Sequence, residues 1–360
     1  MPLLLIPGPT NVPDRVAKAL SKQPVPHREK DFESMLLEQC RRLQPIFGTS
    51  GEVLLIAGSG TAGMEMSLKS LFGPGDRVLN LVSGKFSERF AEITESVGAT
   101  STLLQAEWGH RFDVARAKEE IEKGVAGVTI VHNESSTATT NRGEIPAIAA
   151  AARKAGAFVV VDTISSLGGM PFEMDSSSVD ITVTGSQKCF MMPPGLALIA
   201  INKRAQERMR SRPASGRGYY LDPVAYLDDK GKAPFTPPIN FVFGLKEVLD
   251  MFQEEGLTNV YARHRGCADH VRKRGAELRL PLFPAGPDLA SDAVTGFRVD
   301  GWDEGKLRKL VQQKFDMALG GGQDRVKGKI LRIGHMGMVD KEMVSKGMDA
   351  IEWGLSRVRA

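Results

Sequence analysis

Short apolar runs, separated by segments of helix length, are the feature of this sequence that most restricts its fold. The runs are rich in β-branched residues and nearly continuous in apolar character, which is typical of strands buried on both faces. The predicted strands span residues 53–57, 78–82, 127–132, 158–162 and 180–184. The intervening stretches 62–71, 87–97 and 145–155 predict helices. This alternation predicts an α/β fold with a mostly parallel sheet and helices on both faces.

A further predicted strand, residues 196–201, departs from this pattern. Only the 11 residues 185–195 separate it from the preceding strand, and that length is marginal for a helical crossover. We therefore expect this strand to run antiparallel to its predecessor.

The composition changes after about residue 205, and a long helix is predicted over residues 239–254. Beyond it, short strands at 294–299 and 330–333 and a C-terminal helix indicate a second unit. The predicted divisions are an N-terminal arm of residues 1–20, a large domain of residues 21–256 and a smaller C-terminal α+β domain of residues 257–360.

Charge and cysteine content argue against several classes of protein. The chain has 47 basic and 43 acidic residues and a net charge of +4, and no basic patch with interleaved aromatic residues suggests a nucleic-acid partner. No apolar run reaches membrane-spanning length, and no signal peptide is recognisable. The three cysteines, Cys40, Cys189 and Cys267, are widely spaced, which suits a reducing cytosol. We expect a cytoplasmic protein without a metal site.

A lysine and an aspartate follow two successive predicted strands. Asp162 closes the run 158–162, and Lys188 follows the run 180–184. Taken singly, Lys188 reads more simply as a surface residue and Asp162 as a capping residue. Together at the carboxyl edge of a sheet they can face one ligand. A lysine that loses its proton can attack an aldehyde, and a carboxylate can pair with the ring nitrogen of a pyridoxal cofactor.

A glycine-rich loop supplies a candidate anion site. Gly58-Ser59-Gly60-Thr61 follows a predicted strand and opens a predicted helix, where backbone N–H groups bind phosphate. With Gly63 the loop also matches GxGxxG, but the next strand ends in Ser83-Gly84 rather than in an acid that could bind ribose. A cofactor with one phosphate explains the loop better than a dinucleotide. Trp108 reads either as a core residue or as an indole stacked on that cofactor.

Several short motifs, each modest alone, become specific when taken together. They are Pro7-Gly8-Pro9-Thr10-Asn11-Val12-Pro13, Gly58-Ser59-Gly60-Thr61-Ala62-Gly63-Met64-Glu65, His132-Asn133-Glu134-Ser135-Ser136-Thr137, Val161-Asp162-Thr163-Ile164-Ser165-Ser166-Leu167-Gly168-Gly169, Gly185-Ser186-Gln187-Lys188, Pro193-Pro194-Gly195, Thr236-Pro237-Pro238 and Leu331-Arg332-Ile333-Gly334. In these motifs and in their order, the chain resembles the class V aminotransferases of fold type I, specifically the alanine–glyoxylate and serine–pyruvate group. The resemblance spans almost the whole chain.

The resemblance implies a pyridoxal 5′-phosphate enzyme in which Lys188 holds the cofactor as a Schiff base and Asp162 pairs with its ring nitrogen. The other implied cofactor contacts are Ser59, Gly60, Thr61 and Gln187 at the phosphate, Trp108 on the ring, Ser135 near the 3-oxygen, and Thr236 from the second subunit of a homodimer. Arg332 would grip the substrate α-carboxylate, and Gly8 belongs to the same substrate site. Relatives commonly carry a tyrosine hydroxyl before Thr236; it is missing here, and Tyr219 or Tyr220 could replace it.

The expected reaction is transfer of an amino group from alanine or serine to glyoxylate or pyruvate, by a ping-pong mechanism. An alternative is an acidic donor (aspartate, glutamate or phosphoserine), because His27-Arg28 resembles a pair found in phosphoserine aminotransferases; Arg28 reads more simply as a surface or interface residue. A desulfurase or lyase is less favoured, because Cys189 and Cys267 do not lie on a predicted mobile loop. A nicotinamide-dependent dehydrogenase lacks its ribose acid.

Overall fold

The computed structural model describes residues 2–358. The strands are β1 (Leu3–Leu5), β2 (Glu52–Ala57), β3 (Arg77–Val82), β4 (Thr100–Gln105), β5 (Gly127–Val131), β6 (Asn133–Glu134), β7 (Thr139–Thr140), β8 (Phe158–Asp162), β9 (Ile181–Gly185), β10 (Leu196–Ile201), β11 (Val294–Arg298), β12 (Met317–Gly321) and β13 (Ile330–Gly334). The helices are α1 (Asp14–Leu20), α2 (Lys30–Phe47), α3 (Gly60–Leu71), α4 (Lys85–Ser96), α5 (Val114–Glu122), α6 (Ile145–Lys154), α7 (Lys203–Ser211), α8 (Ala214–Arg217), α9 (Pro223–Asp228), α10 (Ile239–Glu255), α11 (Leu257–Glu277), α12 (Glu304–Phe315) and α13 (Lys341–Leu355), with a 3₁₀ turn η1 (Asp324–Val326).

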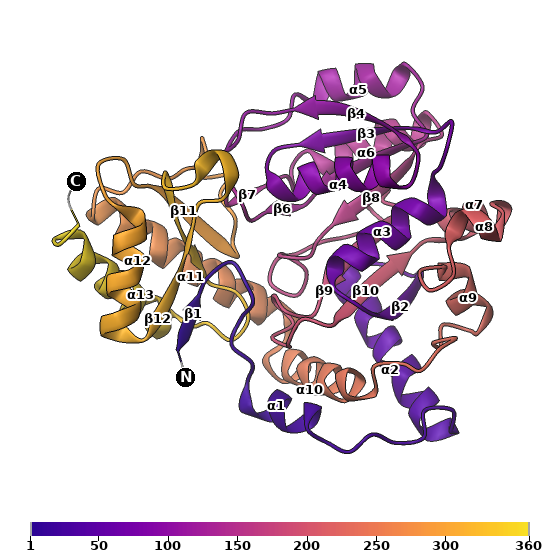
Figure 1. Cartoon of the computed structure of the whole chain (residues 1–360), viewed down its shortest axis with the longest axis horizontal. Helices are drawn as coiled ribbons and strands as arrows, with labels where there is room; N and C mark the ends of the chain where they lie inside the picture. Colours follow the sequence, from indigo (N-terminus) through magenta and orange to yellow (C-terminus); the bar gives the residue numbers. More distant parts are fainter. Residues whose placement is uncertain (1, 359–360) are drawn as a thin grey trace.

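A seven-stranded sheet forms the centre of the larger part of the molecule (Figure 1). Its strand order is β2-β10-β9-β8-β5-β3-β4. All neighbouring pairs are parallel except those made by β10, which runs antiparallel to both β2 and β9. The predicted α/β class, the mostly parallel sheet and the reversed strand at residues 196–201 are therefore confirmed.

The edge strand β4 was not predicted from the sequence. Its run, Thr-Ser-Thr-Leu-Leu-Gln, is only partly apolar, and Leu104 is its one buried residue. An edge strand has a neighbour on one side only, so it needs no continuous apolar run. The sequence signal that identified the buried strands is therefore absent at β4.

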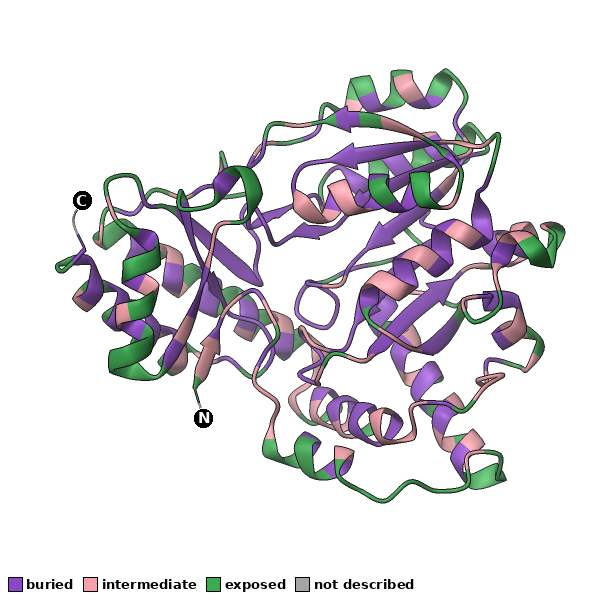
Figure 2. Cartoon of the chain, viewed as in Figure 1, coloured by how far each residue is buried: buried purple, intermediate pink, exposed green. Residues whose placement is uncertain are grey.

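Helices cover both faces of this sheet and create two separate hydrophobic layers. The helices α3, α4 and α7 pack on one face, while α2, α5, α6 and α10 belong to the layer on the other. Figure 2 shows the strands buried between helices whose outer sides are exposed. All five residues of β5 are buried, as are all six of β10, which explains their almost continuous apolar sequence.

A second sheet, β1-β12-β13-β11, lies with α11, α12 and α13 beside the first (Figure 1). Its core is a separate cluster that includes Leu5 and Leu331. The predicted division near residue 256 falls at Gly256, between α10 and α11, where φ is +82°. The strand β1 pairs parallel with β12, so residues 3–5 contribute to the C-terminal sheet, whereas α1 packs on α10.

After β1, the N-terminal segment passes close to the loop between β9 and β10. A Cβ added at Gly334 would lie 2.0 Å from the carbonyl oxygen of Ile6, so this segment passes directly over β13. The backbone N–H of Thr10 donates to the Gln187 carbonyl at 3.2 Å, and its hydroxyl donates to the Lys188 carbonyl at 3.1 Å. Residues 6–10 therefore connect the two sheets at this loop.

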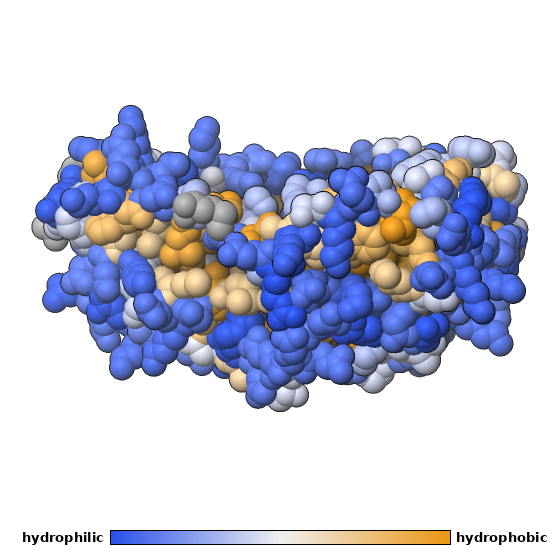
Figure 3. Space-filling model, turned by 90° about the horizontal axis from the view of Figure 1, so that it is seen from below, coloured by the Kyte–Doolittle hydropathy of each residue, from blue (hydrophilic) through white to orange (hydrophobic). Residues whose placement is uncertain are grey.

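The surface mixes charged side chains with smaller apolar areas. Figure 3 shows hydrophobic patches between hydrophilic side chains on the face seen from below. Across residues 2–358, no helix combines the length and the apolar character that crossing a membrane would need.

Candidate active site

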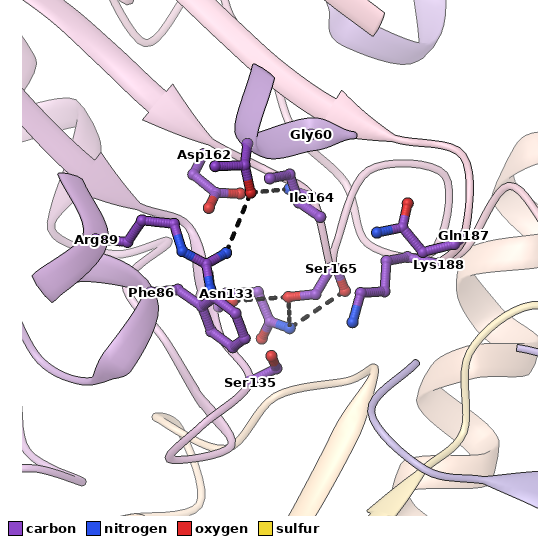
Figure 4. Close-up of a pocket in the computed structure, with 11 residues that line it drawn as sticks. Gly60, Phe86, Arg89, Asn133, Ser135, Asp162, Ile164, Ser165, Gln187 and Lys188 are labelled. Carbon is purple, nitrogen blue, oxygen red and sulfur yellow. Dashed lines mark hydrogen bonds between the residues drawn. The ribbon is translucent and has the colours of Figure 1, made fainter. Parts of the chain in front are cut away.

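One pocket collects residues from the carboxyl edge of the large sheet (Figure 4). Five segments contribute: the start of α3, the first turns of α4, the turn after β5, the loop after β8 and the loop after β9. The lining residues are Gly60, Thr61, Phe86, Arg89, Asn133, Ser135, Asp162, Ile164, Ser165, Gln187 and Lys188. Carboxyl ends of parallel strands meet at one edge of a sheet, which explains why residues so distant in sequence converge.

Lys188 lies on the loop where the chain reverses between β9 and β10. Its amine points into the pocket (Figure 4) and donates a hydrogen bond to the carbonyl of Pro7. Burial lowers the pKa of Lys188 to about 8, because a dehydrated ammonium is disfavoured. The nearby guanidinium of Arg332 also lowers it, while Asp162 opposes the shift. Lys188 therefore has a larger neutral fraction near pH 7 than a free lysine has.

Asp162 ends β8 and faces the same pocket. Its carboxylate accepts the backbone N–H of Ile164 at 2.6 Å. Burial raises the pKa of Asp162 to about 7, and the Ile164 hydrogen bond only partly offsets this. Asp162 has no ion pair within residues 2–358. A buried carboxylate of this kind is stabilised by a cationic group placed next to it.

The start of α3 is open toward the pocket. Ser59 is the N-cap residue, yet its side chain makes no capping hydrogen bond. The side-chain oxygen of Gln187 is buried and has no hydrogen-bond partner among residues 2–358. Thr61 accepts a hydrogen bond from Arg89 at 3.3 Å. Free donors at a helix start, together with a guanidinium, match the needs of a phosphate group. The residues present thus fit a phosphorylated cofactor with a cationic ring.

The turn after β5 forms another wall. Asn133 donates from its amide to the carbonyl and to the hydroxyl of Ser165, at 3.2 and 2.9 Å. The carbonyl of Ser135 accepts a hydrogen bond from Arg332 at 2.8 Å. The predicted residue Ser135 therefore lines the pocket and also contacts the predicted substrate arginine.

Arg332 lies in β13, on the side of the pocket that faces the second sheet. Its guanidinium donates to the carbonyls of Ser135 and Gly321, both at 2.8 Å. Burial lowers the pKa of Arg332 to about 10, and the side chain has no carboxylate partner among residues 2–358. Gly8 comes close to Lys188: a Cβ there would lie 2.4 Å from its Nζ, and the φ of Gly8 is +105°. A side chain at position 8 would therefore displace the lysine amine.

Trp108, predicted to stack on the cofactor, does not line this pocket. It follows β4, the edge strand, and packs with Phe283, Val326 and Ile330. The guanidinium of Arg325 lies 5.3 Å from the centre of its ring. Strand β4 is at the edge of the sheet and is separated by β3 and β5 from β8, which ends in Asp162.

Phe86 is the aromatic residue that lines the pocket, and Arg89 accompanies it (Figure 4). Both lie near the start of α4, which follows β3. In the sequence, Ser83-Gly84 marks the end of that strand and the loop that places Phe86. Above, this pair is used only to argue against a dinucleotide cofactor.

Thr236 and Arg28 lie outside the pocket of their own chain. Both are exposed, and Arg28 borders a separate depression with Glu33 and Lys232. At the position before Thr236, the ring of Phe235 stacks on Tyr220 with centroids 5.3 Å apart. The hydroxyl of Tyr220 donates to the carbonyl of Ala57 at 3.3 Å, immediately before the glycine-rich loop.

This fold and pocket define an α/β enzyme that brings a lysine, an aspartate and an open helix start together at one edge of its sheet. The chain belongs to the class V aminotransferases: the family model "Aminotransferase class-V" matches residues 3–339. It is therefore an aminotransferase of fold type I that depends on pyridoxal phosphate.

Individual relatives agree with this family. The chain is 34% identical to the L-aspartate–glyoxylate aminotransferase of Paracoccus denitrificans, over 97% of this chain and 90% of that protein. It is 35% identical to the serine–glyoxylate aminotransferase of Methylorubrum extorquens, over 93% of this chain and 86% of that protein. The crystal structure of ureidoglycine–glyoxylate aminotransferase from Bacillus subtilis matches with a TM-score of 0.94 and 29% identity, covering 99% of this chain and 93% of that one.

The lowered pKa of Lys188 predicts how cofactor attachment depends on pH. Only the neutral amine attacks an aldehyde, so attachment should rise with pH and reach half its maximum near the pKa of about 8. At pH 7, ~1 in 10 of the amines is then neutral, against ~1 in 3000 for a free lysine. Stopped-flow absorbance of apoprotein mixed with pyridoxal phosphate measures this profile.

Two variants control that experiment. Lys188→Ala should show no absorbance of lysine-bound cofactor. Asp162→Asn should lower the midpoint further, because the Asp162 charge favours the protonated amine. A wild-type midpoint near 10.5 would contradict the burial effect.

The placement of Phe86 predicts a contrast with Trp108. Phe86→Ala should weaken the affinity of the apoprotein for pyridoxal phosphate by roughly fivefold, because ring contacts of this kind contribute about 1 kcal/mol. Trp108→Ala should leave that affinity within about twofold but lower stability by about 3 kcal/mol, as expected for a core tryptophan. Absorbance titration and thermal unfolding give the two quantities, and Phe86→Tyr is the conservative control. The opposite order of affinities would restore Trp108 as the cofactor aromatic.

Proposed function

We propose that this chain transfers the amino group of a small amino acid, alanine or serine, to a 2-oxo acid, glyoxylate or pyruvate. The observation that carries the proposal is the position of Arg332, whose charge acts on Lys188 and whose guanidinium contacts the pocket-lining residue Ser135. Arg332 is a buried guanidinium without a carboxylate partner among residues 2–358, and it contacts the Ser135 carbonyl at the pocket wall. Such a group suits the α-carboxylate that amino acids and 2-oxo acids share.

The proposed roles follow from the geometry of each side chain. Pyridoxal phosphate, when bound, supplies an aldehyde carbon and a ring that withdraws electrons. Lys188 would hold the cofactor, and its neutral amine would move the proton of the substrate Cα. Asp162 would pair with the ring nitrogen of the cofactor. Arg332 would bind the α-carboxylate and so orient the substrate.

A ping-pong order follows from the presence of a single site. Donor and acceptor both need the Arg332 guanidinium and the space beside Lys188, so one must leave before the other binds. The three relatives named above carry different donors in their names (aspartate, serine and ureidoglycine), and all share glyoxylate. Glyoxylate is therefore the acceptor that we rank first.

The competing functions have less support. An acidic donor would use Arg28, which lies in a depression that contains neither Lys188 nor Asp162 of its own chain and so would have to act across the subunit interface. A desulfurase needs a reactive cysteine, yet Cys189 and Cys267 are almost fully buried. Burial raises their pKa values to about 12 and about 11, which disfavours the nucleophilic thiolate.

The donor panel tests this function. With glyoxylate as acceptor, we expect alanine and serine to give higher kcat/KM than aspartate, glutamate or phosphoserine. Arg332→Ala should raise KM for every donor by roughly a hundredfold, since a charged hydrogen-bonded contact contributes about 3 kcal/mol. Arg28→Ala should change all donors alike. A fall confined to acidic donors in Arg28→Ala, or a wild-type preference for them, would favour the acidic-donor alternative.

We also propose a homodimer in which Thr236 of one subunit completes the phosphate site of the other. Its support is the exposure of Thr236 away from its own pocket, together with the neighbouring Tyr219 and Tyr220, which are 84% and 45% exposed. Large exposed aromatic residues of this kind are enriched at protein interfaces.

Mixed dimers test the contribution of Thr236. Lys188→Ala and Thr236→Ala proteins are unfolded together and refolded, and activity is assayed at limiting cofactor. If Thr236 acts across the interface, each mixed dimer regains one intact site, so activity should exceed that of either parent. If Thr236 serves its own pocket, mixing restores nothing. An active monomer in sedimentation would also contradict the proposal.

A further inference from the structure

Glu134 is a fully buried carboxylate that lies behind the wall of the pocket rather than in it. Its oxygens meet donors only. The backbone N–H groups of Phe86 and Ser87 approach Oε2 at 3.1 and 2.9 Å, and the hydroxyl of Ser136 approaches Oε1 at 2.6 Å. Within residues 2–358 it has no ion pair with a lysine or arginine. Such a set of donors suits a deprotonated carboxylate, which can only accept hydrogen bonds.

These contacts cap α4 from a distant part of the chain. The N-cap position of α4 is Gly84, which has no side chain of its own to accept the first free N–H groups. Glu134 accepts two of them, and the hydroxyl oxygen of Ser136 accepts the N–H of Lys85 at 3.0 Å. A Cβ at position 84 would lie 2.5 Å from the Glu134 carboxyl carbon, so the fit leaves no spare room. The residue has a negative charge at the positive end of the helix dipole.

The two segments that Glu134 joins both supply pocket residues. On one side, the first turns of α4 place Phe86 and Arg89 in the pocket. On the other, the next residue, Ser135, lines the pocket and accepts the Arg332 hydrogen bond with its carbonyl. The Glu134 carboxylate therefore links the segment that carries the aromatic ring of Phe86 to the segment that contacts the substrate arginine.

We propose that Glu134 is a positioning residue, which sets Phe86 and Arg89 against Ser135 and Arg332 and so fixes the cofactor and the substrate carboxylate relative to each other. This inference rests on the transaminase function proposed above. Glu134 does not line the pocket itself. Its effect on the reaction passes through the residues that it holds.

The test compares Glu134→Gln with a matched buried carboxylate. Asp180 is also fully buried; it accepts hydrogen bonds from the Val159 N–H at 2.8 Å and from Asn202 and Arg204, both at 2.9 Å. It lies just before β9, at the opposite end of that strand from the pocket. Asp180→Asn therefore reports the cost of disturbing a buried carboxylate without disturbing the site. Ser136→Ala is the milder second variant, because it removes one Glu134 contact and the Lys85 acceptor.

Three quantities are measured for each variant: the dissociation constant of pyridoxal phosphate from the apoprotein, the visible circular dichroism of the bound cofactor, and the donor KM. Glu134→Gln should weaken cofactor binding and raise KM, each on the order of tenfold, and should change the dichroic signal, because small displacements of positioned groups have large effects. Ser136→Ala should show the same changes to a smaller extent. Asp180→Asn should lower the unfolding temperature but keep all three quantities.

The inference is overturned if Glu134→Gln and Ser136→Ala leave the three quantities at their wild-type values. It is also overturned if Asp180→Asn changes them as much at an equal loss of unfolding temperature. If Glu134→Gln does not fold, Ser136→Ala against Asp180→Asn decides. Cofactor affinity and dichroism need no substrate, so a failure of the proposed donor or acceptor would be seen separately in the wild-type activity panel.

Discussion

The reversal of the chain between β9 and β10 is the constraint on which the rest of the site depends. Hydrogen bonds within this segment fix its shape: the hydroxyl of Ser186 donates to the Pro193 carbonyl at 2.6 Å and accepts the Leu196 N–H at 3.2 Å. Because β10 is antiparallel to both of its neighbours, no crossover helix carries the chain away from the sheet edge. Lys188 therefore remains close to Asp162 and out of water.

Burial acts in opposite directions on this pair. It raises the pKa of Asp162 to about 7 and lowers that of Lys188 to about 8, so both groups are costly to keep charged in the free pocket. A ligand with a cationic ring and a reactive aldehyde relieves both costs, because it pairs with the carboxylate and consumes the neutral amine. Arg332 is likewise costly to bury, and the substrate carboxylate proposed for it would offset that cost.

The sequence predicted those parts of the molecule whose signal is local. Fully buried strands such as β8 have continuous apolar runs, and their last residues identify the sheet edge, which is how Asp162 and Lys188 were selected. The structure places both in one pocket, while their catalytic roles stay predictions. The edge strand β4 lacked the apolar signal, and the position of Phe86 in the pocket was missed because sequence does not show which loop bends over the sheet. The cap that Glu134 forms on α4 joins residues about fifty positions apart in the sequence, so no local sequence pattern marks it.

The pairing of β1 with β12 also determines when the site can form as the chain is synthesised. Residues 3–5 are synthesised long before their partners at 317–319. Until β12 has emerged, β1 is unpaired, and residues 6–10 lack this anchor beside the β9–β10 loop, where the carbonyl of Pro7 accepts the Lys188 hydrogen bond. The large sheet can assemble earlier from its own strands. A nascent chain of this protein would therefore fold its core first and complete its active site only after β12 has emerged.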